Sequence, residues 1–514
     1  MVLTALGLVI FSVSLAIYSY CRYRFRFADP IPDANLPKVP FFGNGLSFRG
    51  VNRLKIYPVL HQAFNTKARL FKITFGPMPI ICPNHPDLMQ KVMLDPASMD
   101  KPYFYDFFGI TQGLFGLPYD LWKAHRKVLN PTFNLRILNS FQPIFNDCVN
   151  TMMRNIKAHV KPGEPMNILE FTSPCTLSMV TRTSLGGRVL EREGTKEFCE
   201  GMESLLHQLG IRMFNANLHP DWVYRYTRIY RAEMKARNFC CAWTDKILEE
   251  KKQELAKKKE DMNNNADSKE ENEDNEVSYK KPQIFIDQLL TIPLPDGRPF
   301  SDQEILDEIY TMIAAGNETS AVQSAHTILL LAMHPEIQER AVEEILRVFP
   351  TPEQNFNQDT LKQLELQERI IKESQRLMPV AFILGRAAQH DIQLDDYVCP
   401  KGTIFILNLF EMQRRKEFWG EDAHEFNPDR FLPENSKNRH PYAYAPFSAG
   451  PRSCIGSRYA MMSMKTLLTE VLRNYKLTTD IKYDEIQFKF KVSLHLAHPH
   501  RVFLEPRNLY GGSK

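Results

Sequence analysis

The sequence predicts a mostly α-helical fold with a small β region, preceded by an N-terminal transmembrane helix. Apolar residues recur at helical spacing over Ser301–Met333 and Ser457–Asn474, whereas β-like patterns are short, as in Phe71–Phe75 and Phe405–Leu409. The chain has 514 residues, of which 43% are hydrophobic and 24% are charged. This composition is typical of a globular protein and too polar for a protein that crosses a membrane many times.

The first segment is expected to anchor the chain in a membrane. Val2–Tyr20 carries no charged residue, and a helix of about 20 apolar residues spans a bilayer. Arg22, Arg24 and Arg26 follow it, so the positive-inside rule places the rest of the chain on the cytosolic side. A cleaved signal peptide is the alternative, but it would need a basic residue before a shorter apolar run. The chain is therefore divided into a signal-anchor helix (1–21), a basic and proline-rich hinge (22–45) and one large domain (46–514).

Charge and cysteine content exclude several classes of function. Lys plus Arg total 64 and Asp plus Glu total 60, so the net charge of +4 gives no case for binding nucleic acid. The charged tract 251–281 has almost no apolar residues and is expected to form a solvated surface loop. The nine cysteines show no CxxC pair and no zinc-site spacing, which argues against a disulfide framework. Only Cys454 has an unusual neighbourhood.

Cys454 ends a loop-like segment that precedes the helical pattern beginning at Ser457. Metal coordination deprotonates a thiol, and the amides at a helix N-terminus favour the resulting thiolate. Gly450 and Gly456 allow tight turns and a close approach to a flat ligand, because neither has a Cβ. Arg452 adds a permanent positive charge. The segment therefore suits a thiolate ligand of a metal centre.

The same segment, Phe447-Ser448-Ala449-Gly450-Pro451-Arg452-Ser453-Cys454-Ile455-Gly456, matches the haem-binding signature FxxGxRxCxG. The chain therefore resembles the cytochrome P-450 family of haem-thiolate monooxygenases. The resemblance implies that Cys454 is the axial ligand of haem iron, that Phe447 sits beside its sulfur, and that Arg452 pairs with a haem propionate. The alternative, a structural cysteine in a glycine turn, would require all five fixed residues to coincide by accident.

A second motif, which precedes the cysteine segment in the sequence, is expected to stabilise the fold. Glu373 and Arg376 are three residues apart, so they can pair on one face of a helix. They resemble the family's ExxR motif, and Arg430 in Pro428–Phe431 resembles the arginine that joins this pair. The resemblance implies a charged network whose loss prevents haem binding.

Further residues are assigned to the haem propionates by the same resemblance. Trp122 and Arg126 lie four residues apart on one helical face and resemble the family's WxxxR motif. Arg386 resembles a third propionate residue. Each could be a generic surface residue by itself, and the assignment depends on their order relative to Cys454.

The segment from Ala314 to Ser320 matches the family's oxygen-activation motif, A/G-G-x-D/E-T-T/S. Gly316 weakens the helix, and the Thr319 hydroxyl can bond to the carbonyl of Ala315 one turn earlier. The resemblance implies that Thr319 and Glu318 are catalytic and deliver protons to bound dioxygen. An exposed polar helix face is the alternative, which the apolar flanking residues argue against.

The resemblance covers nearly the whole chain and is closest to the microsomal branch that holds fatty-acid ω-hydroxylases and many insect enzymes. It implies insertion of one oxygen atom from O2 into a lipophilic substrate: a fatty acid, steroid, hormone-like lipid or xenobiotic. NADPH-cytochrome P-450 reductase is the expected electron donor, with cytochrome b5 as an optional second donor, because the chain has no GxGxxG fingerprint. The expected location is the endoplasmic reticulum membrane. The alternatives are a haem-thiolate isomerase or dehydratase acting on peroxides, and a haem carrier or sensor without turnover.

Haem b is predicted to bind without a covalent link to the protein. Many members of this branch carry a glutamate where this chain has Ala315, and that glutamate can form an ester with a haem methyl group. An alanine cannot react, and Glu318 lies about 300° further around the helix. Acidified organic solvent should therefore strip unmodified haem from the protein. A stable haem adduct on a peptide containing Glu318 would contradict the prediction.

Overall fold

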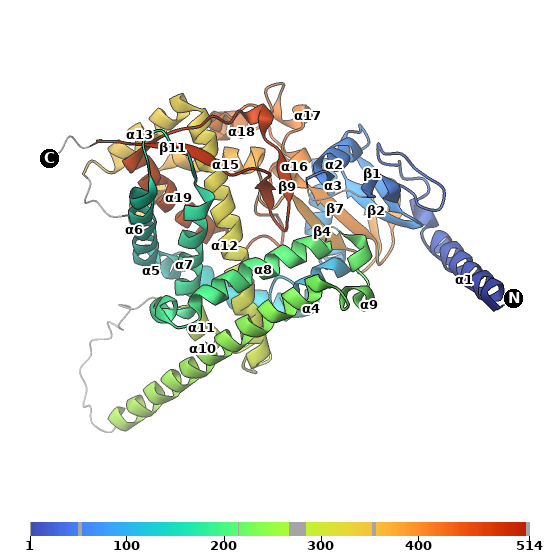
Figure 1. The fold of residues 1–514 in the computed structure, drawn as a ribbon, viewed down its shortest axis with the longest axis horizontal. Helices are drawn as coiled ribbons and strands as arrows, with labels where there is room; N and C mark the ends of the chain where they lie inside the picture. The colour runs from blue at the N-terminus through green and yellow to red at the C-terminus, as the bar shows by residue number, and fades with distance from the viewer. Residues whose placement is uncertain are drawn as a thin grey trace. The chain divides into compact units, whose positions relative to one another are not determined.

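The computed structural model describes residues 2–49, 54–110, 112–213, 215–266, 284–351 and 356–509. The chain folds into two compact units, each assembled from segments that lie far apart in the sequence. Helices predominate and strands are short, which confirms a mostly α fold with a small β region (Figure 1). Unit 1 is made of Met1–Tyr103, Lys372–Cys454 and Gln487–Ala497, and unit 2 of Phe104–Ile371, Ile455–Ile486 and His498–Lys514.

Unit 1 is organised by a four-stranded sheet with the order β1-β2-β7-β4. β1 (Leu70–Phe75) and β2 (Met78–Pro83) form an antiparallel pair, and β7 (Ile404–Asn408) runs parallel to β2. β4 (Ile383–Ala387) is antiparallel to β7 and places Arg386 opposite Phe405. Both predicted β segments are therefore confirmed. The strands are rich in β-branched and aromatic residues, which suit a half-buried pleated surface.

Short elements complete unit 1. From Leu409 to Cys454 the structure has short helical turns and no strand, so the path of this segment depends on side-chain contacts rather than on a hydrogen-bonded ladder. The helices, 3-10 turns and remaining strands are α1 (Val2–Arg24), η1 (Arg26–Ala28), η2 (Gly45–Phe48), α2 (Ile56–Phe64), α3 (Pro86–Leu94), η3 (Pro96–Ser98), β5 (Ile392–Leu394), β6 (Tyr397–Cys399), α16 (Leu409–Met412), α17 (Lys416–Trp419), η8 (Pro428–Phe431), α18 (Pro433–Ser436), η9 (Pro441–Ala443), β9 (Phe488–Phe490) and β10 (Leu494–Leu496).

The longest buried element of unit 2 is helix α12 (Asp302–Met333), which packs along α7 (Leu169–Leu185) and also contacts α19 (Ser457–Asn474). Ser301 caps α12 in a capping box with Glu304, where each side chain accepts from the other residue's backbone amide. Both long helices that the sequence predicts are therefore confirmed.

Further helices surround α12 within unit 2. α8 (Thr195–Met213) lies beside the first part of α10 (Arg228–Ala266) (Figure 1). Two elements are divided between the units: η4 (Tyr103–Phe108) begins with the last residue of a unit 1 segment, and α15 (Glu365–Leu377) belongs to unit 1 from Lys372 onward. The other elements are α4 (Tyr119–Leu129), η5 (Asn130–Phe133), α5 (Leu135–Ser140), α6 (Gln142–His159), β3 (Met166–Asn167), η6 (Gly187–Glu191), η7 (Ala216–Leu218), α9 (Asp221–Tyr224), α11 (Phe285–Leu289), α13 (Pro335–Val348), α14 (Gln358–Gln363), β8 (Tyr475–Thr478), η10 (Tyr483–Glu485) and β11 (Arg501–Pro506).

The charged tract 251–281 differs from the predicted surface loop. Its first part continues helix α10 as far as Ala266, and the rest lies outside the described residues. Lys, Glu, Gln, Ala and Leu all favour helix, and Lys251 pairs with Glu254 at 2.9 Å across one turn. The prediction failed because a lack of apolar residues prevents burial but does not prevent a solvated helix.

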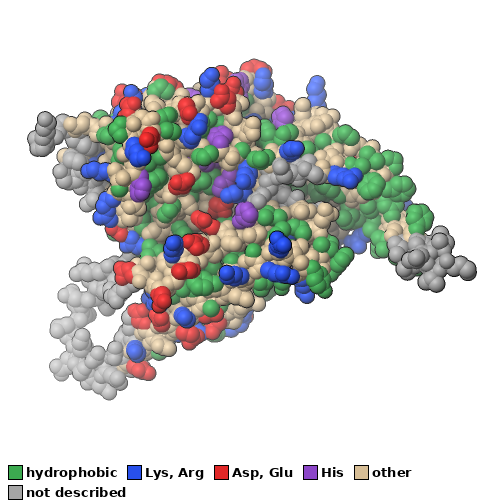
Figure 2. All heavy atoms as spheres, in the orientation of Figure 1, with side chains coloured by type: hydrophobic (Ala, Val, Ile, Leu, Met, Phe, Trp, Pro, Cys, Tyr) green, Lys and Arg blue, Asp and Glu red, His purple; other side chains and the backbone are tan. Residues whose placement is uncertain are grey.

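The predicted N-terminal helix is present as α1, although the side chains of residues 2–8 and 10 lie outside the described part of the chain. Large apolar side chains from Val9 onward are exposed along it, and Phe41 and Phe42 are exposed in the loop that follows. Figure 2 shows hydrophobic side chains gathered over this part of unit 1. In the described portion of the sequence, no helix has both the length and the apolar character that a membrane crossing requires.

Candidate functional site

Cys454 is the one exposed cysteine among nine, all of which the structure describes and none of which forms a disulfide. Cysteine is among the residue types most often buried, so an exposed thiol is unusual. The loop that presents it is closed by the amide of Cys454, which donates to the carbonyl of Phe447 at 2.8 Å. Ser448 and Gly450 adopt left-handed conformations, with φ of 58° and 71°. This loop therefore holds Cys454 as an exposed residue.

The two glycines of this loop have different roles. At Gly450, a Cβ would lie 2.3 Å from the carbonyl oxygen of Met93, so the close approach is to the backbone of α3 and not only to a ligand. Gly456 has a φ of −87° and immediately precedes α19, where its carbonyl accepts from the amide of Ala460 at 2.8 Å. Only Gly450 needs to be glycine for conformational reasons.

A cluster of three cationic side chains lies in unit 1 and includes two predicted propionate residues, Arg386 and Arg452. Both are buried, and the Arg452 Nε donates to the carbonyl of Met99 at 3.0 Å. The backbone of Asp100 forms an antiparallel β-bridge with that of Ala387, the residue after Arg386. Lys101, the residue after Asp100, is the third member of the cluster. Burial lowers the pKa of Lys101 well below its ordinary value, and the charges of Arg386 and Arg452 lower that pKa further.

This cationic cluster fits a ligand that carries carboxylates. Like charges in a partly desolvated region repel one another, and anionic groups placed among them would offset the repulsion. Haem carries two propionates, and its iron accepts a thiolate such as that of Cys454, which lies in the same unit. The residues of unit 1 therefore fit haem. Sequence reasoning missed Lys101 because no local pattern marks it.

The ExxR pair forms as predicted and is fully buried. Glu373 and Arg376 are both 0% exposed, and two hydrogen bonds of 2.7 and 2.8 Å join them. Arg376 also donates to the carbonyl oxygens of Gln413, Ala423 and Glu425. One guanidinium therefore ties helix α15 to three points of the irregular segment that leads to the cysteine loop.

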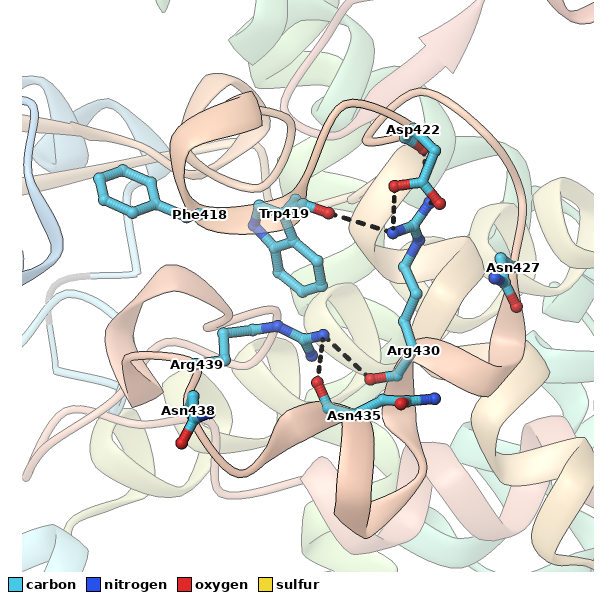
Figure 3. Close-up of a pocket in the computed structure, with 8 residues that line it drawn as sticks. All are labelled: Phe418, Trp419, Asp422, Asn427, Arg430, Asn435, Asn438 and Arg439. Atoms are coloured by element: carbon cyan, nitrogen blue, oxygen red, sulfur yellow. Dashed lines mark hydrogen bonds and ion pairs between the residues drawn. The ribbon is translucent and has the colours of Figure 1, made fainter.

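Arg430 joins this network from the outside, as predicted. Its Nε lies 3.4 Å from the Glu373 carboxylate. One of its terminal nitrogens pairs with the Asp422 carboxylate at 2.6 Å (Figure 3). The hydrogen bond from Arg430 holds the pKa of Asp422 below its ordinary value.

A surface pocket of about 400 Å³ lies next to this network. On its wall, the guanidinium of Arg439 lies over the ring of Trp419, 4.0 Å from the ring centroid. The pocket is lined by Phe418, Trp419, Asp422, Asn427, Arg430, Asn435, Asn438 and Arg439, and so by none of the predicted catalytic or cofactor-binding residues.

In unit 2, the predicted oxygen-activation segment is the accessible part of an otherwise buried helix. From Glu304 to Ala332, which the structure describes in full, every residue of α12 is buried except residues 314–316, 318 and 319. Thr319 donates its hydroxyl hydrogen to the carbonyl of Ala315 at 2.6 Å, as the sequence predicts. Ala315 is exposed, and Glu318 is partly buried.

Gly316 allows α12 and α7 to pack closely. A Cβ there would lie 2.9 Å from a methyl group of Val180 on α7. The next residue, Asn317, is buried, and its side-chain oxygen accepts from the Thr176 hydroxyl at 2.9 Å. α12 runs unbroken through this point, so the glycine serves packing and no helix break accompanies it.

Trp122 and Arg126 lie on helix α4, also in unit 2. Trp122 is buried and stacks on Tyr119 with ring centroids 5.9 Å apart. Arg126 donates from its Nε to the side chain of Asn130 at 2.7 Å. Between them, His125 is buried against two carboxylates of α12, a contact that sequence reasoning missed because its partners are distant in the chain.

The structure thus groups the predicted residues within each unit. In unit 1 it brings together Arg386 and Arg452, and separately Glu373, Arg376 and Arg430. In unit 2, Glu318 and Thr319 share the accessible stretch of α12, and Trp122 and Arg126 share α4.

Comparison with known proteins gives one consistent result. The family model described as Cytochrome P-450 matches residues 34–503. The chain is 30% identical to cytochrome P-450 4c21 of Blattella germanica over 510 residues, which cover 99% of each chain. It is 27% identical to cytochrome P-450 4c3 of Drosophila melanogaster over 96% of this chain and 93% of that relative. It is also 26% identical to cytochrome P-450 4V2 of Homo sapiens over 97% of this chain and 94% of that relative.

Replacing Glu373 by Gln should destabilise the protein strongly. The change leaves two buried arginine side chains facing a neutral amide, and removing one partner of a buried ion pair costs about 3–5 kcal/mol. Asp422→Asn is the matched control, because its side chain is 47% exposed and such pairs contribute about 0–1 kcal/mol. Urea unfolding followed by circular dichroism measures both. Equal losses for the two variants would contradict the prediction.

Proposed function

Because this chain belongs to the cytochrome P-450 family, we propose that it inserts one oxygen atom from O2 into a lipophilic substrate, with Cys454 as the thiolate ligand of haem iron. It is a monooxygenase and hence an oxidoreductase, with haem iron as cofactor and a redox partner as electron source. The observation that carries the proposal is the exposed thiol of Cys454 within a complete FxxGxRxCxG segment.

We propose that haem b is held without a covalent link. Arg386, Arg452 and Lys101 are the unit 1 residues assigned to its propionates, on the grounds of their shared positive charge and of the burial of the two arginines. Trp122 and Arg126 of unit 2 are assigned to them by the WxxxR motif. When bound, haem supplies the iron at which O2 is reduced and one oxygen atom is passed to the substrate.

Thr319 and Glu318 are proposed to handle the protons of this reaction. Reduction of O2 to one hydroxyl group in the product and one water consumes two electrons and two protons. The Thr319 hydroxyl donates its own hydrogen to the Ala315 carbonyl, so its oxygen lone pairs are oriented to accept a hydrogen bond from a water molecule. A water held there can pass a proton onward, and the carboxylate of Glu318 can replace that proton from solvent.

Electron supply and location are proposed from the resemblance to the microsomal branch of the family. We propose NADPH-cytochrome P-450 reductase as the donor, with cytochrome b5 as an optional second donor. The proposed location is the endoplasmic reticulum membrane, with the catalytic part in the cytosol. Helix α1 is the proposed anchor, supported by its exposed apolar side chains and by Arg22, Arg24 and Arg26 at its end.

The substrate is proposed to be a fatty acid, steroid, hormone-like lipid or xenobiotic. Ala315 is exposed on the accessible stretch of α12, so this position contributes a methyl group and not a charge. Reductase-dependent NADPH consumption in the presence of added lipophilic compounds tests whether the reaction is a monooxygenation. Product formation that needs neither reductase nor O2 would instead indicate an isomerase or dehydratase.

The first prediction of this proposal concerns the iron ligand. The reduced protein with carbon monoxide should show the red-shifted Soret band typical of thiolate ligation, and Cys454→His should abolish that band because imidazole is a weaker electron donor. Cys21→Ser, which removes another thiol of unit 1, should leave it unchanged. Persistence of the band in Cys454→His would exclude this residue as the ligand.

The second prediction concerns proton delivery. Thr319→Ala should keep haem binding but reduce product formed per NADPH by about tenfold or more, with peroxide released, since positioned proton transfer contributes at least about 10²-fold to many reactions. Thr327→Ala is the control: its hydroxyl makes the same bond to the carbonyl one turn earlier on α12, at 2.8 Å, but it is buried. Unchanged coupling in Thr319→Ala, measured with a true substrate, would remove the proposed role.

A further inference from the structure

A buried histidine joins helices α4 and α12 in unit 2. His125 is 2% exposed, and its Nδ1 lies 2.8 Å from Oε1 of Glu308, which is 0% exposed. Its Nε2 lies 3.4 Å from Oε1 of Glu304, one turn earlier on α12. Both ring nitrogens therefore face carboxylates of the same helix. Burial strengthens such a contact, because the local dielectric constant is low.

The carboxylate of Glu304 is itself held in place, and that of Glu308 is buried. Glu304 accepts two hydrogen bonds of 2.7 Å from Arg298 and closes the capping box of Ser301. The hydrogen bonds from Arg298 lower the pKa of Glu304 to about 2, so it is ionised at neutral pH. Burial raises the pKa of Glu308, against the effect of the His125 hydrogen bond, and Asp307 beside it raises that pKa further. The ring of Phe300 covers His125 at 5.1 Å, which keeps the contact away from water.

His125 lies on α4 close to two residues that are assigned to haem binding. It lies three residues after Trp122 and immediately before Arg126. Successive residues of a helix are separated by 100° and 1.5 Å, so fixing one side chain at both ends of its ring fixes the rotation and the axial position of its neighbours.

We propose that Glu308 and His125 are positioning residues for the haem-binding helix α4: their buried contact sets the direction from which Trp122 and Arg126 meet a haem propionate. This inference rests on the proposed function. It assigns neither residue a part in the chemistry. Outer partners of this kind orient ligand residues in metal sites, and their loss typically costs about 10–100-fold in affinity.

The test uses the full-length holoprotein and a series of variants at the two positions. His125→Leu removes the contact and should speed haem transfer to apomyoglobin by about 10-fold or more. His125→Asn should restore most of the loss, because an asparagine amide can donate to Glu308 in place of Nδ1–H. In the double variant His125→Leu with Glu308→Leu, the effect should be smaller than the sum of the single effects, since the two residues act through one contact.

Two readouts separate positioning from a general loss of stability. In folded His125→Leu holoprotein, the propionate bending bands of the resonance Raman spectrum should shift, and the reduction potential should fall because the propionate charge is less well compensated. His159→Leu is the control, since His159 is exposed in the same unit and bonds only to the carbonyl of Asn155 in its own helix.

The outcomes are distinct. Faster haem loss with unshifted Raman bands and an unshifted potential would mean that the contact only stabilises the fold, and would overturn the inference. Haem retention equal to that of His159→Leu would overturn it as well. A wild-type protein that shows no thiolate-ligated haem would instead defeat the proposed function, before any variant is compared.

Discussion

The buried bond between Glu373 and Arg376 is the interaction on which the architecture of unit 1 depends. Residues 413–430 contain only short helical turns, so no backbone ladder determines their path. Arg376 supplies that constraint by donating to three carbonyl oxygens from this segment, and Glu373 compensates its charge. A buried ion pair contributes little net stability compared with apolar packing. Its value here is that it specifies one conformation for a segment that lacks a repeating pattern.

A second constraint acts on α12 in unit 2. A helix that is buried on all sides is normally a purely structural element. Here the burial is interrupted for less than two turns, where two alanines and a glycine precede buried Asn317 and the partly buried Glu318 and Thr319. Small side chains leave the backbone accessible, and the Thr319 hydroxyl is oriented by a carbonyl of its own helix. The side chains of Glu318 and Thr319 are therefore held by a helix whose packing restricts its movement.

Sequence reasoning succeeded where the signal is local. The long helices follow from apolar spacing, the bond between Thr319 and Ala315 from a separation of four residues, and the Glu373–Arg376 pair from a separation of three. The role of the irregular loop around Cys454 could be predicted only from its complete FxxGxRxCxG signature. Reasoning failed where the interacting residues are distant in the chain: the charge of Arg386 acts on Lys101, and His125 contacts Glu308 across 183 residues. The helical part of 251–281 was missed because low hydrophobicity was taken to mean the absence of regular structure.

The interrupted burial of α12 also has an evolutionary consequence. Substitutions at most positions of this helix must preserve close packing, because a buried core tolerates few changes of volume. Ala315 is the exception, since its side chain is exposed, and Ala314 before it is only partly buried against the core. Diversification can therefore be concentrated on one turn of the helix without loss of foldability. A lineage could acquire new substrate preferences at these positions while inheriting the same scaffold unchanged.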